Sequence, residues 1–141
     1  MNNVKYQQLH ELPKVLNNSY INTAATNTQV SLEGHGKFDE SKKFTVIQNR
    51  KGHRRNNNLS YVLTSNLGIL VRIDIHGKTH GKIPTPHVHI FDDLHNNGTT
   101  VVPLAKLASY SLSDDIVDSL IAFLKYNHFE TNNLKISPSL V

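Results

Sequence analysis

The clearest structural signal in the chain is the run ILVRIDIH at residues 69–76. Aliphatic and β-branched residues dominate it, and its two charged residues, Arg72 and Asp74, fall two positions apart, as is typical of a β-strand. Shorter runs of the same kind lie at residues 29–33, 44–48, 59–64 and 87–91. Because these runs follow one another without a helical pattern between them, we expect an antiparallel sheet.

A short helix is predicted near the N-terminus. Leu9, Leu12 and Leu16 recur at helical spacing. Pro13 should break or kink this helix, because proline has no backbone N–H to donate. Residues 17–28 are polar and rich in turn-forming residues, so we expect them to form a loop.

A second helix is predicted at residues 113–126. We expect Ser113 to cap its start and Asn127 to end it in a left-handed conformation. Its apolar residues form one stripe at helical spacing: Ile116, Val117, Leu120, Ile121 and Leu124. The sequence therefore predicts an α+β fold in a single domain, residues 1–141. We expect a twisted antiparallel β-sheet of about five strands, with an N-terminal and a C-terminal helix packed against it.

Composition excludes several classes of protein. Cysteine is absent from the 141 residues, so disulfides, thiolate metal sites and a cysteine nucleophile are ruled out. No run approaches the roughly eighteen apolar residues of a membrane span, and the N-terminus does not resemble a signal peptide. We therefore expect a cytoplasmic protein, located in a host cell if the chain comes from a phage. The formal net charge of +4 excludes a DNA mimic, which needs a dense negative surface.

Histidine is frequent, and five of the nine histidines lie within residues 76–95. Residues two apart on a strand point to the same face, so His87 shares a face with His89, and Asp74 shares one with His76. If the two strands pair as a hairpin, the side chains of these residues converge.

This convergence predicts a metal site. We expect His80, in the loop between the strands, to bind one ion together with His87 and His89. Asp74 is the expected fourth ligand, with His76 in reserve. Imidazole and carboxylate ligands suit zinc. A site with four protein ligands has no open position, so the zinc ion is expected to be structural.

Catalytic interpretations of the same residues stay open. The spacing of Gly81, His87 and His89 matches the opening of the cupin metal motif, although Asp93 stands where that motif has glutamate. Two imidazoles with Arg72 could cleave RNA by general acid–base catalysis. A zinc ion with an open position could hydrolyse a substrate. We expect no enzymatic activity, and keep a histidine-cluster RNase or a metal-dependent hydrolase of a toxin-like system as the alternative.

Residues 42–55 contain six basic residues and no acidic one. This segment is either a solvated hairpin tip or a contact for an anionic surface, which could be a phosphate backbone or an acidic protein patch. We expect Arg50, Lys51, Arg54 and Arg55 to contact the partner.

The histidine region resembles a family of small bacterial and phage proteins of uncharacterised function. The family pattern is R-[LI]-D-x-x-G-x-x-H followed by P-H-[LV]-H-[IL]. Its positions are filled here by Arg72, Asp74, Gly77, His80, Pro86, His87 and His89. The chain is also similar to a metal-containing family of phage inhibitors of type II CRISPR effectors.

The second resemblance implies a function. The protein would contain structural zinc, dock on the RNA-guided CRISPR nuclease of the host and block DNA binding. Binding to free nucleic acid would be weak and nonspecific, and no membrane partner is expected.

Overall fold

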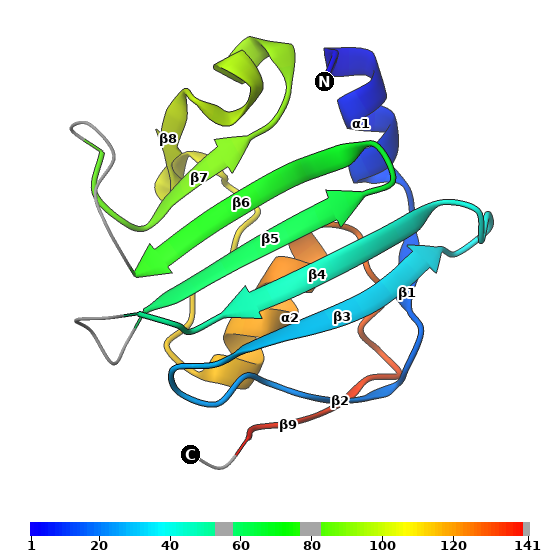
Figure 1. The fold of residues 1–141 in the computed structure, drawn as a ribbon, viewed down its shortest axis with the longest axis vertical. Helices are drawn as coiled ribbons and strands as arrows, with labels where there is room; N and C mark the ends of the chain where they lie inside the picture. The colour runs from blue at the N-terminus through cyan, green and yellow to red at the C-terminus, as the bar shows by residue number, and fades with distance from the viewer. Residues whose placement is uncertain (53–57, 77–82, 140–141) are drawn as a thin grey trace.

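A computed structural model describes residues 1–52, 58–76 and 83–139 of the protein. Its main element is a seven-stranded antiparallel sheet in the order β1-β3-β4-β5-β6-β7-β8 (Figure 1). The strands are β1 (Lys14–Leu16), β3 (Gln29–Gly36), β4 (Lys43–Asn49), β5 (Leu59–Ser65), β6 (Gly68–His76), β7 (His87–Ile90) and β8 (Val101–Pro103). The α+β class is confirmed, but the sheet has seven strands and not about five. The two additional strands, β1 and β8, have three residues each, too few for the alternation by which a strand is recognised in a sequence.

A second, parallel sheet joins β2 (Tyr20–Asn22) to β9 (Lys135–Ser137). The loop predicted for residues 17–28 therefore contains a strand. Ile21 is the buried residue of β2, and it pairs with Ile136 of β9. This small sheet holds the C-terminal segment against the N-terminal part of the chain.

Helix α1 spans Asn3–Glu11. Asn2 caps its start, because the Asn2 side chain accepts a hydrogen bond from the Lys5 N–H. The helix ends before Pro13, as predicted, and Leu16 lies in β1 instead of continuing the helical stripe.

Helix α2 spans Ile116–Tyr126. Its N-cap is Asp115 and not the predicted Ser113. Asn127 follows the helix with a φ of -93°, so the prediction of a left-handed Asn127 is wrong, and His128 has the left-handed φ of 65° instead. Among the described residues, no helix is long and apolar enough to cross a membrane.

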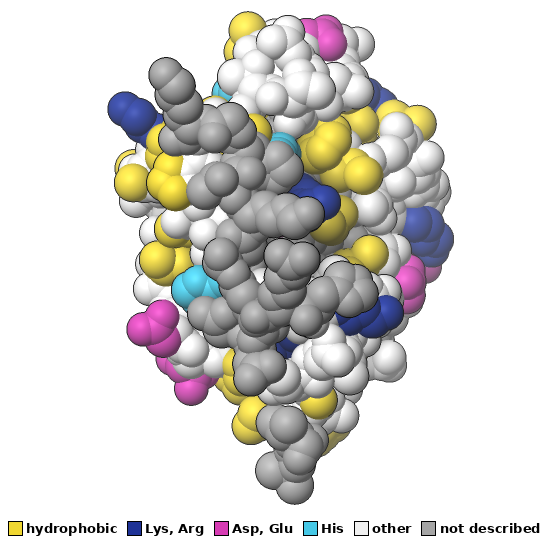
Figure 2. Space-filling model, turned by 60° about the vertical axis from the view of Figure 1, so that its left-hand side comes forward, with side chains coloured by type: hydrophobic (Ala, Val, Ile, Leu, Met, Phe, Trp, Pro, Cys, Tyr) yellow, Lys and Arg dark blue, Asp and Glu magenta, His cyan; other side chains and the backbone are white. Residues whose placement is uncertain are grey.

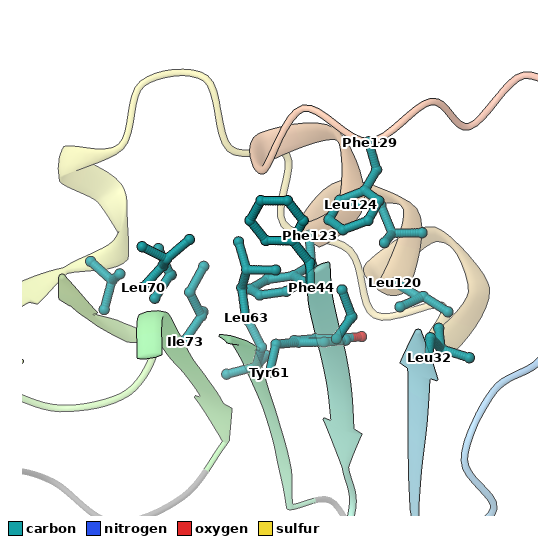
Figure 3. Close-up of a cluster of buried hydrophobic side chains, with 14 of the residues drawn as sticks. Leu32, Phe44, Tyr61, Leu63, Leu70, Ile73, Leu120, Phe123, Leu124 and Phe129 are labelled. Carbon is teal, nitrogen blue, oxygen red and sulfur yellow. The ribbon is translucent and has the colours of Figure 1, made fainter. Parts of the chain in front are cut away.

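Helix α2 packs on one face of the large sheet, which we call the inner face. Figure 3 shows side chains of β3–β6 and of α2 pointing toward one another across this core. Tyr61 of β5 stacks on Phe123 of α2, with 4.9 Å between the ring centroids. The Tyr61 hydroxyl donates to Ser119 Oγ at 2.8 Å and accepts from Gln48 Nε2 at 2.9 Å. The side chains of Gln48, Tyr61 and Ser119 are therefore paired with one another inside this core.

The opposite, outer face of the sheet is more open. Thr45, Ile47 and Asn49 of β4 alternate with buried residues and are partly exposed. In the view of Figure 1, α2 lies behind the sheet, and no helix of the described residues crosses in front of β3–β6. Two short 3-10 helices, η1 (Asp93–Gly98) and η2 (Leu104–Lys106), flank β8 at the far edge of the sheet.

Lys14 is a fully buried cation at the start of β1. Its ammonium donates to three backbone carbonyls, those of His10 at 2.7 Å, Leu12 at 2.9 Å and Asn127 at 2.7 Å. These carbonyls belong to the C-terminal ends of α1 and α2, where helices leave oxygens without a backbone partner. Lys14 thus links the ends of the two helices.

Candidate metal centre

β6 and β7 pair as an antiparallel hairpin. In the register of this pair, Asp74 is opposite His87, and Arg72 is opposite His89. Ile73, between the two charged residues of β6, is buried in the core. Because successive side chains alternate between faces, the four polar residues lie together on the outer face.

Asp74 lies at the centre of this group. Its Oδ2 lies 2.9 Å from His87 Nε2 and 3.3 Å from His89 Nε2. The ligand atoms of the three residues all lie within 4.8 Å of one another, and the three side chains are buried. This group could hold a metal ion. Within residues 1–52, 58–76 and 83–139, it is the one group of three or more His, Asp or Glu side chains close enough together to do so.

Backbone carbonyls determine where both imidazoles carry a proton. His87 Nδ1 lies 3.3 Å from the Pro84 carbonyl oxygen, and His89 Nδ1 lies 2.9 Å from that of Gly98. A carbonyl oxygen can only accept a hydrogen bond, so each Nδ1 must be the donor. In a neutral imidazole the Nε2 then presents a lone pair, and both Nε2 atoms face Asp74.

Lone pairs on two nitrogens and on a carboxylate oxygen repel one another unless positive charge lies between them. A metal ion shared by the three atoms would supply that positive charge. Support of Nδ1–H by a carbonyl is the usual arrangement around a metal-ligating histidine. Zinc bonds of about 2.0–2.1 Å at tetrahedral angles place neighbouring ligand atoms roughly 3.3 Å apart. The 2.9 and 3.3 Å separations around Asp74 Oδ2 are close to that spacing.

Arg72 holds the second oxygen of the carboxylate, since its Nε donates to Asp74 Oδ1 at 2.9 Å. Burial alone would raise the pKa of Asp74. The hydrogen bond and charge of Arg72, followed by those of His87, outweigh burial and lower this pKa below its ordinary value. The Asp74 side chain is therefore ionised at neutral pH, as an anionic ligand must be.

The two other predicted ligands, His80 and His76, are not part of this group of three described residues. His80, the expected third imidazole, lies outside the described residues. His76 is exposed at the end of β6 and does not belong to the group of three. A register shift separates His76, which pairs with Leu59, from Asp74, which pairs with Ser60, so simple alternation does not extend to His76.

The predicted basic contacts are only partly described. Arg54 and Arg55 lie outside the described residues. Arg50 is partly buried, and its Nη1 donates to the Ala24 carbonyl at 2.8 Å, so this guanidinium also supports the fold. Lys51 is exposed. On the coloured part of the side drawn in Figure 2, Lys and Arg side chains are scattered among acidic and hydrophobic ones.

The contribution of η1 to the centre was not predicted. Asn96, Asn97 and Gly98 all have positive φ values, of 48°, 52° and 91°, as is typical of Asn and Gly in tight turns. The Gly98 carbonyl is the acceptor for His89 Nδ1. A turn sequence shows where the chain reverses, but it does not show which side chain its carbonyl contacts.

Comparisons with known proteins give one match. No curated protein and no solved structure matches the chain. A family match covers residues 1–129, which include Arg72, Asp74, His87 and His89. This family has no assigned function, so the predicted link to CRISPR inhibitors stays a prediction. The chain belongs to DUF6978, a family of unknown function.

Proposed function

We propose that this protein binds one zinc ion through Asp74, His87 and His89. The observation that carries the proposal is the pair of Nε2 atoms directed at one carboxylate oxygen, while both Nδ1 atoms donate to backbone carbonyls. A divalent cation satisfies all three lone pairs at once. Two imidazoles and a carboxylate without sulfur are ordinary ligands of zinc.

We expect the zinc ion to be structural, with His80 as its fourth ligand. An ion with four protein ligands has no open position for a substrate. The ion would join β6 to β7 and, through the bond between His89 and Gly98, would also hold η1. Because an unfolded chain has no preformed site, the free energy of zinc binding then adds to the free energy of unfolding.

Metal analysis and zinc titration of metal-free protein test the site. We expect one zinc per chain in the wild type and its loss in the His87→Ala/His89→Ala double variant. His35→Ala is the matched control, because it removes an imidazole of β3 that donates to Asn17 Oδ1 and lies outside the cluster. Full zinc retention by the double variant would contradict the proposal.

The biological role we propose is inhibition of an RNA-guided CRISPR nuclease by docking on it. The motif resemblance supports this role, and so does the net charge of +4, which excludes DNA mimicry. Arg50, Lys51, Arg54 and Arg55 are the proposed contacts. Zinc-loaded protein should inhibit DNA cleavage by a type II effector. The Arg54→Glu/Arg55→Glu variant should inhibit less, with a larger difference at low salt.

Two results would contradict this role. One is undiminished DNA cleavage by type II effectors at saturating zinc-loaded protein. The other is hydrolysis of RNA or another substrate that a chelator abolishes while leaving the melting temperature unchanged. That result would assign a catalytic zinc ion and the enzymatic alternative.

A further inference from the structure

Within residues 1–52, 58–76 and 83–139, Arg72 has hydrogen-bonding capacity that no contact uses. Its Nε is engaged by Asp74 Oδ1, but its side chain is 49% exposed on the outer face of the sheet. Among the described residues, no acceptor lies within hydrogen-bonding distance of its two Nη atoms. A guanidinium presents these N–H groups in a planar fork that matches the oxygens of an oxyanion.

The charges around Arg72 are not balanced once zinc is bound. The ion brings two positive charges and Arg72 one, against the single negative charge of Asp74. The register neighbours of Arg72 are Val62 of β5 and His89 of β7, and neither is acidic. No acidic residue occurs in the sequence between His76 and His87 either. A net charge beside buried groups is costly unless an ion of opposite sign compensates it.

We infer that the centre binds an oxyanion of the phosphate class, held by the Arg72 guanidinium next to the metal on the outer face of the sheet. This inference rests on the zinc site proposed above. The anion needs no coordination position on the zinc ion, because Arg72 supplies the hydrogen bonds and the ion supplies charge. Free phosphate and a phosphodiester share the oxygens that Arg72 would recognise.

Calorimetric titration of zinc-loaded protein with inorganic phosphate tests the inference. The variants are Arg72→Gln, which removes the guanidinium, and Arg72→Lys, which keeps the charge without the fork. The control is Lys43→Gln, which removes a charge from the exposed first residue of β4, a strand that β5 separates from β6. We expect Arg72→Gln to weaken phosphate binding by about 10- to 100-fold, the range for hydrogen bonds to a charged group. Arg72→Lys should bind with intermediate affinity, and Lys43→Gln like the wild type.

Zinc content is measured for every sample, because Arg72 also positions Asp74. If zinc-loaded wild type binds no phosphate, or if zinc-loaded Arg72→Gln binds it equally well, the inference is wrong and the zinc site stands. If the wild type binds no zinc, the proposed function fails and this inference fails with it. A second titration with a dinucleotide distinguishes the sources: tighter binding than inorganic phosphate assigns a phosphodiester, and weaker binding assigns the free ion.

Discussion

Replacing Lys14 by methionine should make the protein less stable, by an amount that grows with pH. The Lys14→Met variant keeps most of the aliphatic volume and removes the three hydrogen bonds to the carbonyls of His10, Leu12 and Asn127. Near pH 7.5 a lysine with a pKa of about 7 is mostly a neutral amine, which has two N–H groups to donate. At about 1 kcal/mol for each bond, the variant should lose roughly 2 kcal/mol of unfolding free energy at that pH.

The pH dependence follows from the pKa of Lys14. Burial lowers this pKa from 10.5 to about 7 in the folded protein. Between these two values the unfolded chain binds more protons than the folded one, so stability rises with pH. Each pH unit contributes about 1.4 kcal/mol. The difference between the wild type and Lys14→Met should therefore widen by about 2.5 kcal/mol from pH 7.5 to pH 9.5.

Urea denaturation of both proteins at several pH values measures this difference. Subtracting the unfolding free energy of the variant from that of the wild type at each pH cancels the contributions of the titrating groups that the substitution leaves unchanged. Two sets of contacts favour the charged form of Lys14 and so oppose the lowering of its pKa by burial. One is the three carbonyl oxygens, and the other is the rings of Phe44 and Phe129, whose centroids lie 5.0 and 5.8 Å from Lys14 Nζ. A difference that stays constant or narrows with rising pH would show that these contacts prevail and would refute the reasoning.

Three further predictions test other parts of the structure. Gly98→Ala should destabilise the protein by about 1–3 kcal/mol and weaken zinc binding, because Gly98 has a φ of +91° and an added Cβ would lie 2.5 Å from the Phe91 ring. Gly68→Ala, with a φ of +122° but nothing within 4 Å, isolates the backbone strain in the same denaturation assay. Tyr61→Phe should cost about 1–3 kcal/mol, since it leaves Gln48 and Ser119 without their buried partner; an unchanged denaturation midpoint would contradict this. Removal of zinc by a chelator should lower the melting temperature by about 10 °C, the effect of a ligand at roughly 100 times its Kd, and added zinc should restore it. Calorimetry that finds the same melting temperature with and without chelator would exclude a structural ion.

The sequence predicts the parts of this fold that depend on local patterns. The run at 69–76 appears as β6, and the apolar stripe before Tyr126 appears as α2. β1, β2 and β8 were missed because three residues carry no measurable alternation. They form through pairing with distant segments, which a local pattern does not reveal.

In the candidate centre, too, local spacing predicts some features and contacts with distant segments determine the others. Spacing predicts that His87 and His89 share a face and that Asp74 can meet them, and the register of β6 and β7 brings the three together. The carbonyls of Pro84 and Gly98 could not be predicted, because their contacts depend on loop conformation and not on residue type. Those carbonyls fix the imidazole protons and thereby make the cluster suited to a cation.

Zinc K-edge X-ray absorption of the zinc-loaded protein tests the central claim most directly. The account predicts nitrogen and oxygen ligands at about 2.0–2.1 Å, with the outer-shell scattering of coordinated imidazole. The single variants His87→Ala and His89→Ala should each lose imidazole scattering or the ion itself, and His35→Ala should leave the spectrum unchanged. An unchanged imidazole contribution in both cluster variants, or a spectrum of zinc bound only to water oxygens in the wild type, would contradict the assignment of Asp74, His87 and His89 as ligands.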